Sequence, residues 1–175
     1  MDYPDAYVMI EFVVKDRRLR LYPDGKITIR AIMRGKETKK EIWNDVRFGD
    51  NGIGYLQCNI TINGGQKGLL KHRLLYLARN PDWDIFDTSQ SNCIDHKNHD
   101  TKDNSAENLR IVTQQQNQFN RAGVKGYYWY KRANKWQAYI KVDFKNKYLG
   151  LFEKEEDAHA AYLEAKARLH IIPES

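Results

Sequence analysis

Several features that would restrict the class of this protein are scarce in its sequence. The 175 residues include only two cysteines, Cys58 and Cys93, too few for a disulfide framework or a cysteine-based zinc site. No apolar run approaches the roughly 18 residues that a membrane-spanning helix needs. The first residues, MDYPDAYVMIEF, lack the basic start and the small-residue cleavage site of a secretory signal. These absences predict a protein of a reducing cytoplasm.

Charge, by contrast, is plentiful and unevenly distributed along the chain. The formal net charge is +6. Residues 121–151 hold eight lysines and arginines against one acid, whereas residues 153–157 hold four acids and one lysine. A positive segment followed at once by a negative one indicates two faces, one of which would suit a polyanion such as a nucleic acid.

The first third of the chain has the composition of a β-rich scaffold. Turn signals such as Pro23-Asp24-Gly25 and Asn63-Gly64-Gly65 separate runs of β-branched and aromatic residues. An amphipathic helix is expected at residues 68–79, ending before Pro81. Strands are expected at residues 7–14, 18–22, 26–33, 41–48 and 54–62.

The middle of the chain carries the residues with the clearest chemistry. Cutting a phosphodiester needs a base to activate water, which histidine supplies at neutral pH. It also needs positive charge at the phosphate, which a divalent cation held by oxygen ligands supplies. Asp95 and His96 are adjacent at the end of a strand expected at residues 92–96. An aspartate and a histidine in this setting are candidates for a metal ligand and a base.

The next residues predict how the rest of such a site would assemble. A polar loop at residues 97–106 returns the chain to a second strand at 107–112, which would bring Asn108 alongside His96. Thr113 is a candidate N-cap for a helix carrying Asn117. A strand–loop–strand–helix unit of this kind would let Asn117 meet Asp95 across a gap sized for one ion.

The string CIDHKNHDTKDNSAENLRIVTQQQNQFNR, residues 93–121, resembles the HNH (ββα-metal) endonucleases, particularly the phage-type homing endonucleases. The resemblance implies that Asp95 and Asn117 hold one divalent metal ion, Mg²⁺ or Mn²⁺. It implies His96 as the general base and Asn108 as the residue that orients it. Lys71-His72-Arg73-Leu74 resembles the helix that precedes the family's catalytic hairpin. The string departs from the family at His99-Asp100, often a Gly-Asn pair, and at Ile111, commonly Trp.

The C-terminal section resembles a different family, the AP2/ERF DNA-binding domains. The resemblance covers about 48 residues and rests on the order of Gly123-Val124, Trp129, Trp136, Tyr148-Leu149-Gly150, Phe152 and an alanine-rich helix. It implies a three-stranded antiparallel sheet on one helix, with the sheet in the major groove. Strands are expected at residues 126–132, 135–142 and 147–152, and a helix at 155–170.

Alternation within these strands places Ala138, Ile140, Leu149 and Phe152 in the core and basic side chains outside, free for phosphates and base edges. Arg132 is the best candidate for contacting guanine, and the lysines for phosphate. The residues expected to bind DNA are His72, Arg73, Lys125, Lys131, Arg132, Trp136, Lys141, Lys145 and Lys147.

Together these patterns predict an α+β protein in two parts. Residues 1–121 would form the β-rich part and the HNH nuclease, and residues 122–175 an AP2-like module that selects the target on double-stranded DNA. The expected source is a phage or a bacterial cell. With one active site and no evident dimerisation segment, a monomer that nicks is expected. The alternatives are a restriction or host-takeover nuclease and, in another class, a DNA-binding regulator that does not cut.

Overall fold

The fold is that of a computed structural model, which describes residues 9–121 and 123–172. These residues form two compact units, the first made of residues 9–87 and 100–109 and the second of the remaining described residues. The units do not divide at residues 121 and 122, and the expected domains stay a prediction. Residues 7 and 8 of the first expected strand lie outside the described residues, as does Ala122. The mixture of many strands and few helices agrees with the expected α+β class.

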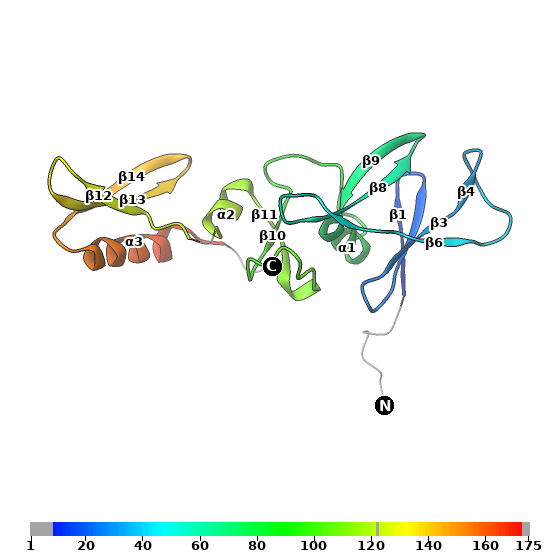
Figure 1. The fold of residues 1–175 in the computed structure, drawn as a ribbon, viewed down its shortest axis with the longest axis horizontal. Coiled ribbons are helices and arrows are strands. Elements are labelled where there is room, and N and C mark those ends of the chain that lie inside the picture. The colour runs from blue at the N-terminus through cyan, green and yellow to red at the C-terminus, as the bar shows by residue number, and fades with distance from the viewer. Residues whose placement is uncertain (1–8, 122, 173–175) are drawn as a thin grey trace, which may run out of the picture. The chain divides into compact units, whose positions relative to one another are not determined.

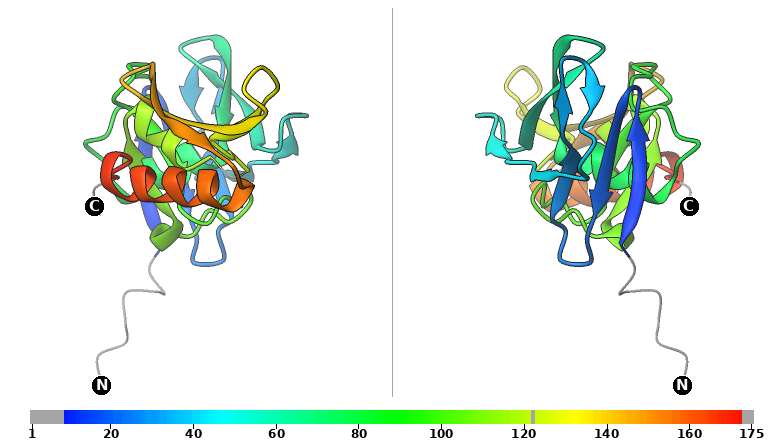
Figure 2. Two further views of the ribbon diagram at one scale, coloured as in Figure 1. Left: turned by 90° about the vertical axis from the view of Figure 1, so that its left-hand side faces the viewer. Right: turned by 90° about the vertical axis from the view of Figure 1, so that its right-hand side faces the viewer.

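An antiparallel sheet forms the start of the first unit and is drawn in blue to cyan in the right-hand view of Figure 2. Alternate residues such as Phe12, Val14 and Leu19 point into the core, as expected for a sheet with one buried face. The buried Arg17 donates hydrogen bonds to the main-chain oxygens of Thr61 (2.8 Å) and Arg30 (2.9 Å). In sheet order, the strands are β1 (Ile10–Val14), β2 (Arg17–Leu21), β3 (Ile27–Arg30) and β6 (Trp43–Asp45).

The rest of the first unit adds two small sheets and one helix. The helix α1 (Lys71–Arg79) contributes Leu74, Leu75 and Leu77 to the same core. It begins three residues later than expected, because residues 68–70 pair as strand with residues 57–59. The small sheets consist of β4 (Ile32–Met33) with β5 (Lys36–Glu37), and of β7 (Gly49–Asp50), β8 (Leu56–Ile62) and β9 (Gly65–Leu70).

The segment with the HNH-like string folds as a short hairpin followed by a helix. Strand β10 (Cys93–His96) pairs with β11 (Leu109–Val112), and α2 (Gln114–Phe119) follows. Thr113 caps α2 as expected, because its side chain accepts a hydrogen bond from the main-chain N–H of Gln116. The second strand is shorter than expected, since residues 106–108 form a 3₁₀ turn, η2 (Ala106–Asn108).

The C-terminal part of the second unit is a three-stranded antiparallel sheet with one helix along a single face (Figure 1). Ala138, Ile140 and Tyr162 are buried between the sheet and the helix. None of the helices in the described part of the chain has the length and apolar character needed to cross a bilayer. The elements are β12 (Tyr127–Tyr130), β13 (Lys135–Val142), β14 (Lys145–Phe152) and α3 (Glu155–Leu169).

The register of this sheet decides which basic side chains share a face. Ile140 pairs with Lys147, and Val142 with Lys145. Because directly paired residues project to the same side, Lys145 and Lys147 lie on the face that α3 covers, although both are exposed. Lys141 lies on the opposite face. The expectation that all three lysines project from one outer face is therefore wrong for Lys145 and Lys147.

Gly126 permits a close approach between β12 and α3. A Cβ atom at this position would lie 2.0 Å from Cδ2 of the buried Tyr162, and the residue has a φ of +70°. Gly123 has a similar φ of +74° with nothing within 4 Å of a Cβ. We expect Gly126→Ala to lower the free energy of unfolding of this unit by about 1–3 kcal/mol more than Gly123→Ala. Urea unfolding followed by near-UV circular dichroism measures the difference, and equal losses would contradict the close approach.

Candidate active site

Strand β10 holds two adjacent polar side chains away from solvent. Asp95 and His96 are each 5% exposed. A carboxylate at this depth is costly unless other groups compensate its charge. The buried Asp95 carboxylate therefore needs hydrogen-bonding or charged partners.

Two side chains donate hydrogen bonds to the Asp95 carboxylate, and both lie in the second unit with it. Arg110, on the paired strand β11, donates from Nε (2.9 Å) and from Nη2 (2.7 Å) to Oδ2. Asn120, at the end of α2, donates from Nδ2 to both carboxylate oxygens at 3.0 Å. The same Nδ2 lies 3.0 Å from the main-chain oxygen of His96. Asn120 therefore links α2 to both residues of the Asp-His pair.

Asn117, the expected second metal ligand, lies one helical turn before Asn120 on α2. Residues three apart share a helix face, so Asn117 lies on the side of the helix from which Asn120 reaches Asp95. Its side chain is half-buried and has no hydrogen bond to any other described residue. The amide that contacts Asp95 is thus that of Asn120, and the role of Asn117 as a metal ligand stays a prediction.

Sequence reasoning missed both partners of Asp95. Arg110 follows Asn108 by two residues, and strand alternation would have marked it as a side chain able to face the hairpin partner. Asn120 follows Asn117 by three residues, the spacing of one helix face. Neither signal was strong, because an arginine in a strand and an asparagine after a helix are common.

Asn108 is buried in the first unit, at the end of η2, directly before β11. Its side-chain Nδ2 donates a hydrogen bond to the main-chain oxygen of Asp103 at 2.7 Å. Asn108 is 6% exposed. This bond ties together the end of the loop between β10 and β11. The role expected for Asn108, orienting His96, stays a prediction.

The available donors suit a hard divalent cation better than zinc. The described residues include no cluster of three or more histidine, cysteine or acidic side chains. One carboxylate and one amide oxygen, from Asp95 and Asn117, are the type of ligands that Mg²⁺ and Mn²⁺ accept, with further positions left to water and phosphate. The donor chemistry fits one ion, and the ion would have to share Asp95 with Arg110 and Asn120.

Contacts within the second unit continue from α2 to α3. The ring of Phe119 stacks on that of His170, with centroids 3.8 Å apart and an angle of 7°. Nε2 of His170 lies 2.9 Å from the main-chain oxygen of Lys141. Burial lowers the pKa of His170, the contact with the Lys141 oxygen opposes this, and the charge of Lys166 lowers it further. The His170 side chain therefore joins the helix beside the Asp-His pair to the C-terminal sheet.

The residues expected to bind DNA fall into two groups. His72 is buried on α1 with its ring 5.2 Å from that of Tyr55. Arg73 donates to the main-chain oxygen of Ile85 at 2.7 Å and lies over the ring of Trp83. Both therefore pack within the first unit. The other residues expected to bind DNA belong to the C-terminal module. Trp136 is half-buried there. The basic side chains are exposed, and they are Lys125, Lys131, Arg132, Lys141, Lys145 and Lys147.

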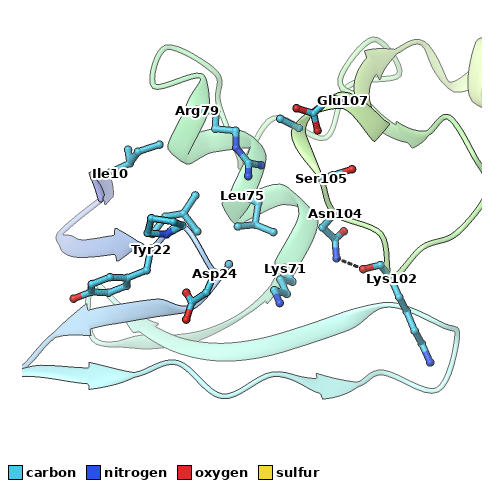
Figure 3. Close-up of a pocket in the computed structure, with 14 residues that line it drawn as sticks. Ile10, Tyr22, Asp24, Lys71, Leu75, Arg79, Lys102, Asn104, Ser105 and Glu107 are labelled. Atoms are coloured by element: carbon cyan, nitrogen blue, oxygen red, sulfur yellow. Dashed lines mark hydrogen bonds between the residues drawn. The ribbon is translucent and has the colours of Figure 1, made fainter. Parts of the chain in front are cut away.

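The first unit also contains a cavity of about 550 Å³, drawn in Figure 3. Lys71, Leu75 and Arg79 of α1 line one side of it, and the loop that includes Asn104 and Ser105 lines another. None of the residues expected at the active site lines this cavity. The residues that line the cavity therefore do not include Asp95 or His96.

Comparison with known proteins gives one match, on the segment just described. A family model with the description HNH endonuclease matches residues 69–119, which include Asp95, His96, Asn108 and Asn117. No curated protein and no solved structure matches the chain. The match covers less than a third of the chain and ends before the C-terminal sheet. Residues 69–119 are therefore similar to an HNH endonuclease domain, and this similarity supports an HNH nuclease.

Proposed function

We propose that the protein is an endonuclease that hydrolyses phosphodiester bonds of double-stranded DNA with the help of one divalent metal ion, Mg²⁺ or Mn²⁺. One observation carries the proposal. Asp95 and His96 are buried neighbours on a strand inside the segment that matches HNH endonucleases. A carboxylate and an imidazole side by side supply a cation ligand and a general base within one short element.

Each residue has a definite task in this proposal. His96 removes a proton from the water that attacks the phosphate, and Asn108 holds the loop so that the imidazole is correctly oriented. Asp95 and Asn117 hold the metal ion, which when bound supplies positive charge to the scissile phosphate and the leaving oxygen. Arg110 and Asn120 fix the Asp95 carboxylate through the hydrogen bonds described above.

Asn120 offers a test of that positioning role. We expect Asn120→Ala to weaken Mn²⁺ binding by about 10- to 100-fold, as is typical for loss of a group that orients a metal ligand. Mn²⁺ binding followed by electron paramagnetic resonance measures this without requiring cleavage. Gln114→Ala, at an exposed position of the same helix, is the matched control and should leave the affinity unchanged. Unchanged affinity in Asn120→Ala would mean that Asn120 only stabilises the fold.

The C-terminal sheet and α3 would select the target, as an AP2-like module of a phage or mobile-element homing endonuclease. Their exposed lysines and Arg132 supply a positive surface for the DNA backbone. Removing Lys141 should weaken binding to all sequences alike and reduce the slope of the salt dependence by about one unit. With one active site in the chain, a monomer would nick one strand per encounter.

A second candidate function is a DNA-binding regulator that does not cut. The observation in its favour is that both oxygens of Asp95 already accept hydrogen bonds from Arg110 and Asn120. Incubation of supercoiled plasmid with the protein in Mg²⁺ or Mn²⁺ separates the two functions. A nuclease should convert the plasmid to nicked circles with 5′-phosphate and 3′-hydroxyl ends, and EDTA should stop the reaction without preventing binding. Binding with no nicking in either metal would favour the regulator.

A further inference from the structure

The face of the C-terminal sheet opposite α3 has an unusual composition. The register pairs Tyr128 with Gln137 and Tyr139 with Tyr148, and Asn146 pairs with Lys141. Because paired residues project to the same side, these side chains share the outer face. The outer face includes a depression of about 320 Å³, lined by Tyr128, Gln137, Tyr139, Asn146 and Tyr148.

The two amides in this depression are placed to recognise a hydrogen-bonding partner. The hydroxyl of Tyr128 lies 3.0 Å from Oε1 of Gln137, in position to donate to it. That bond fixes the direction of the Gln137 amide and leaves its NH₂ group and a second lone pair of Oε1 for another molecule. The exposed side chain of Asn146 has no hydrogen bond to any other described residue.

The tyrosine rings favour the edge of a duplex over stacked single-stranded bases. The rings of Tyr128 and Tyr139 are inclined to each other by 63° with centroids 5.9 Å apart. Bases of a single strand stack on flat, exposed aromatic faces, and two rings inclined in this way do not form one platform. Tyr128 and Tyr148 are 46% and 61% exposed, so apolar ring surface is available to a methyl group.

Charge around the depression matches a polyanion. No acidic side chain lines it, and Lys141 projects from the same face. Lys131 and Arg132 are exposed at the turn between β12 and β13. A strand ribbon fits the major groove of B-DNA, where such cations would contact phosphates on either side.

From these observations we infer that this face, here called the amide-tyrosine face, reads A·T base pairs in the major groove. The inference rests on the proposed DNA-cutting function and names its sequence preference. Gln137 and Asn146 are the side-chain types that pair with adenine through its N6 and N7 atoms, and tyrosine rings can contact the thymine methyl group. The commonest contact to guanine uses an arginine or a lysine, and neither lines the depression.

The test replaces one hydrogen-bonding side chain, that of Gln137, and determines which DNA sequence the protein then selects. The full chain is used in EDTA to select binding sites from random duplex DNA. Wild-type sites should contain an A·T-rich core. Gln137→Glu keeps the shape but offers only acceptors, which suit the N4 amino group of cytosine. One adenine of the site should therefore become cytosine, with a 5- to 100-fold change in the relative affinity for the two bases. Gln66→Glu, an equal charge change at an exposed position of β9, should keep the wild-type site.

Several results would overturn the inference. These are wild-type sites without adenine preference, a Gln137→Glu variant that selects the wild-type site, or tighter binding of single strands than of duplex. Plasmid nicking by the wild-type protein judges the proposed function separately. Nicking without adenine preference removes only the base-reading role of the amide-tyrosine face. A wild-type protein that neither binds nor nicks duplex DNA removes both.

Discussion

Replacement of His96 by alanine should lower the rate of DNA cleavage at least ~100-fold, the usual cost of losing a general base. The affinity for DNA should change by no more than a few-fold, because His96 is 5% exposed and offers little surface to a phosphate backbone. Single-turnover cleavage of an intact duplex that contains the cleavage site gives the rate. A binding assay in EDTA gives the affinity. A fall in rate with unchanged affinity is the result expected of a residue that acts in the chemical step.

His99 provides the control for this experiment. It is an exposed histidine in the loop after β10, with a φ of 66°. His99→Asn suits the control, since asparagine tolerates that backbone conformation. The control should cut at the wild-type rate. If His96→Ala also cut at that rate, the base would have to be another residue, and the mechanism proposed for the Asp-His pair would be wrong.

Local patterns were enough to predict most elements of the fold. The C-terminal helix, the strand at residues 135–142 and the capped helix after Thr113 lie close to where their patterns place them. Each of these depends on neighbours within a few residues, such as a capping side chain or a two-residue alternation. Asn108 was placed in a strand for the same reason, but the chain makes a 3₁₀ turn there and the strand begins at Leu109.

The faces of β14 could not be predicted from alternation, because the strand contains an irregularity. Tyr139 pairs with Tyr148, whereas Ala138 pairs with Gly150, so Leu149 is an extra residue in the ladder. A bulge of this kind exchanges the two faces of a strand beyond it. Lys147 therefore shares a face with Ile140, while Phe152 shares a face with Trp136. No local signal in the sequence specifies where a bulge falls.

At the candidate site, contacts between residues far apart in the sequence could not be predicted. The adjacency of Asp95 and His96 is visible in the sequence, and the structure buries both. The bonds from Arg110 and Asn120 cross 15 and 25 residues of chain. Which asparagine of α2 reaches the carboxylate depends on where the helix ends and how it packs. The helix pattern alone could not distinguish Asn117 from Asn120.

The ion pair between Arg110 and Asp95 should give the largest effect on stability. Its atoms lie 2.7 Å apart, and the two side chains are 12% and 5% exposed. Removing one partner of such a pair leaves a buried charge uncompensated, at a cost of about 3–5 kcal/mol. We therefore expect Arg110→Ala to lower the free energy of unfolding of the second unit by that amount in EDTA, as measured by urea denaturation. The double variant Asp95→Leu with Arg110→Met removes both charges and should lose much less.

A divalent cation should restore part of this loss, because it can replace the missing positive charge at Asp95. A ligand that binds only the folded state at 100 times its Kd stabilises it by about 2.7 kcal/mol. Mn²⁺ should therefore raise the Tm of Arg110→Ala more than that of the wild-type protein, in which Arg110 competes for the carboxylate. Asp95→Ala should show no such response to the metal. Equal Mn²⁺ responses in all three proteins would place the cation elsewhere, and Arg110 would then act only as a structural partner of Asp95.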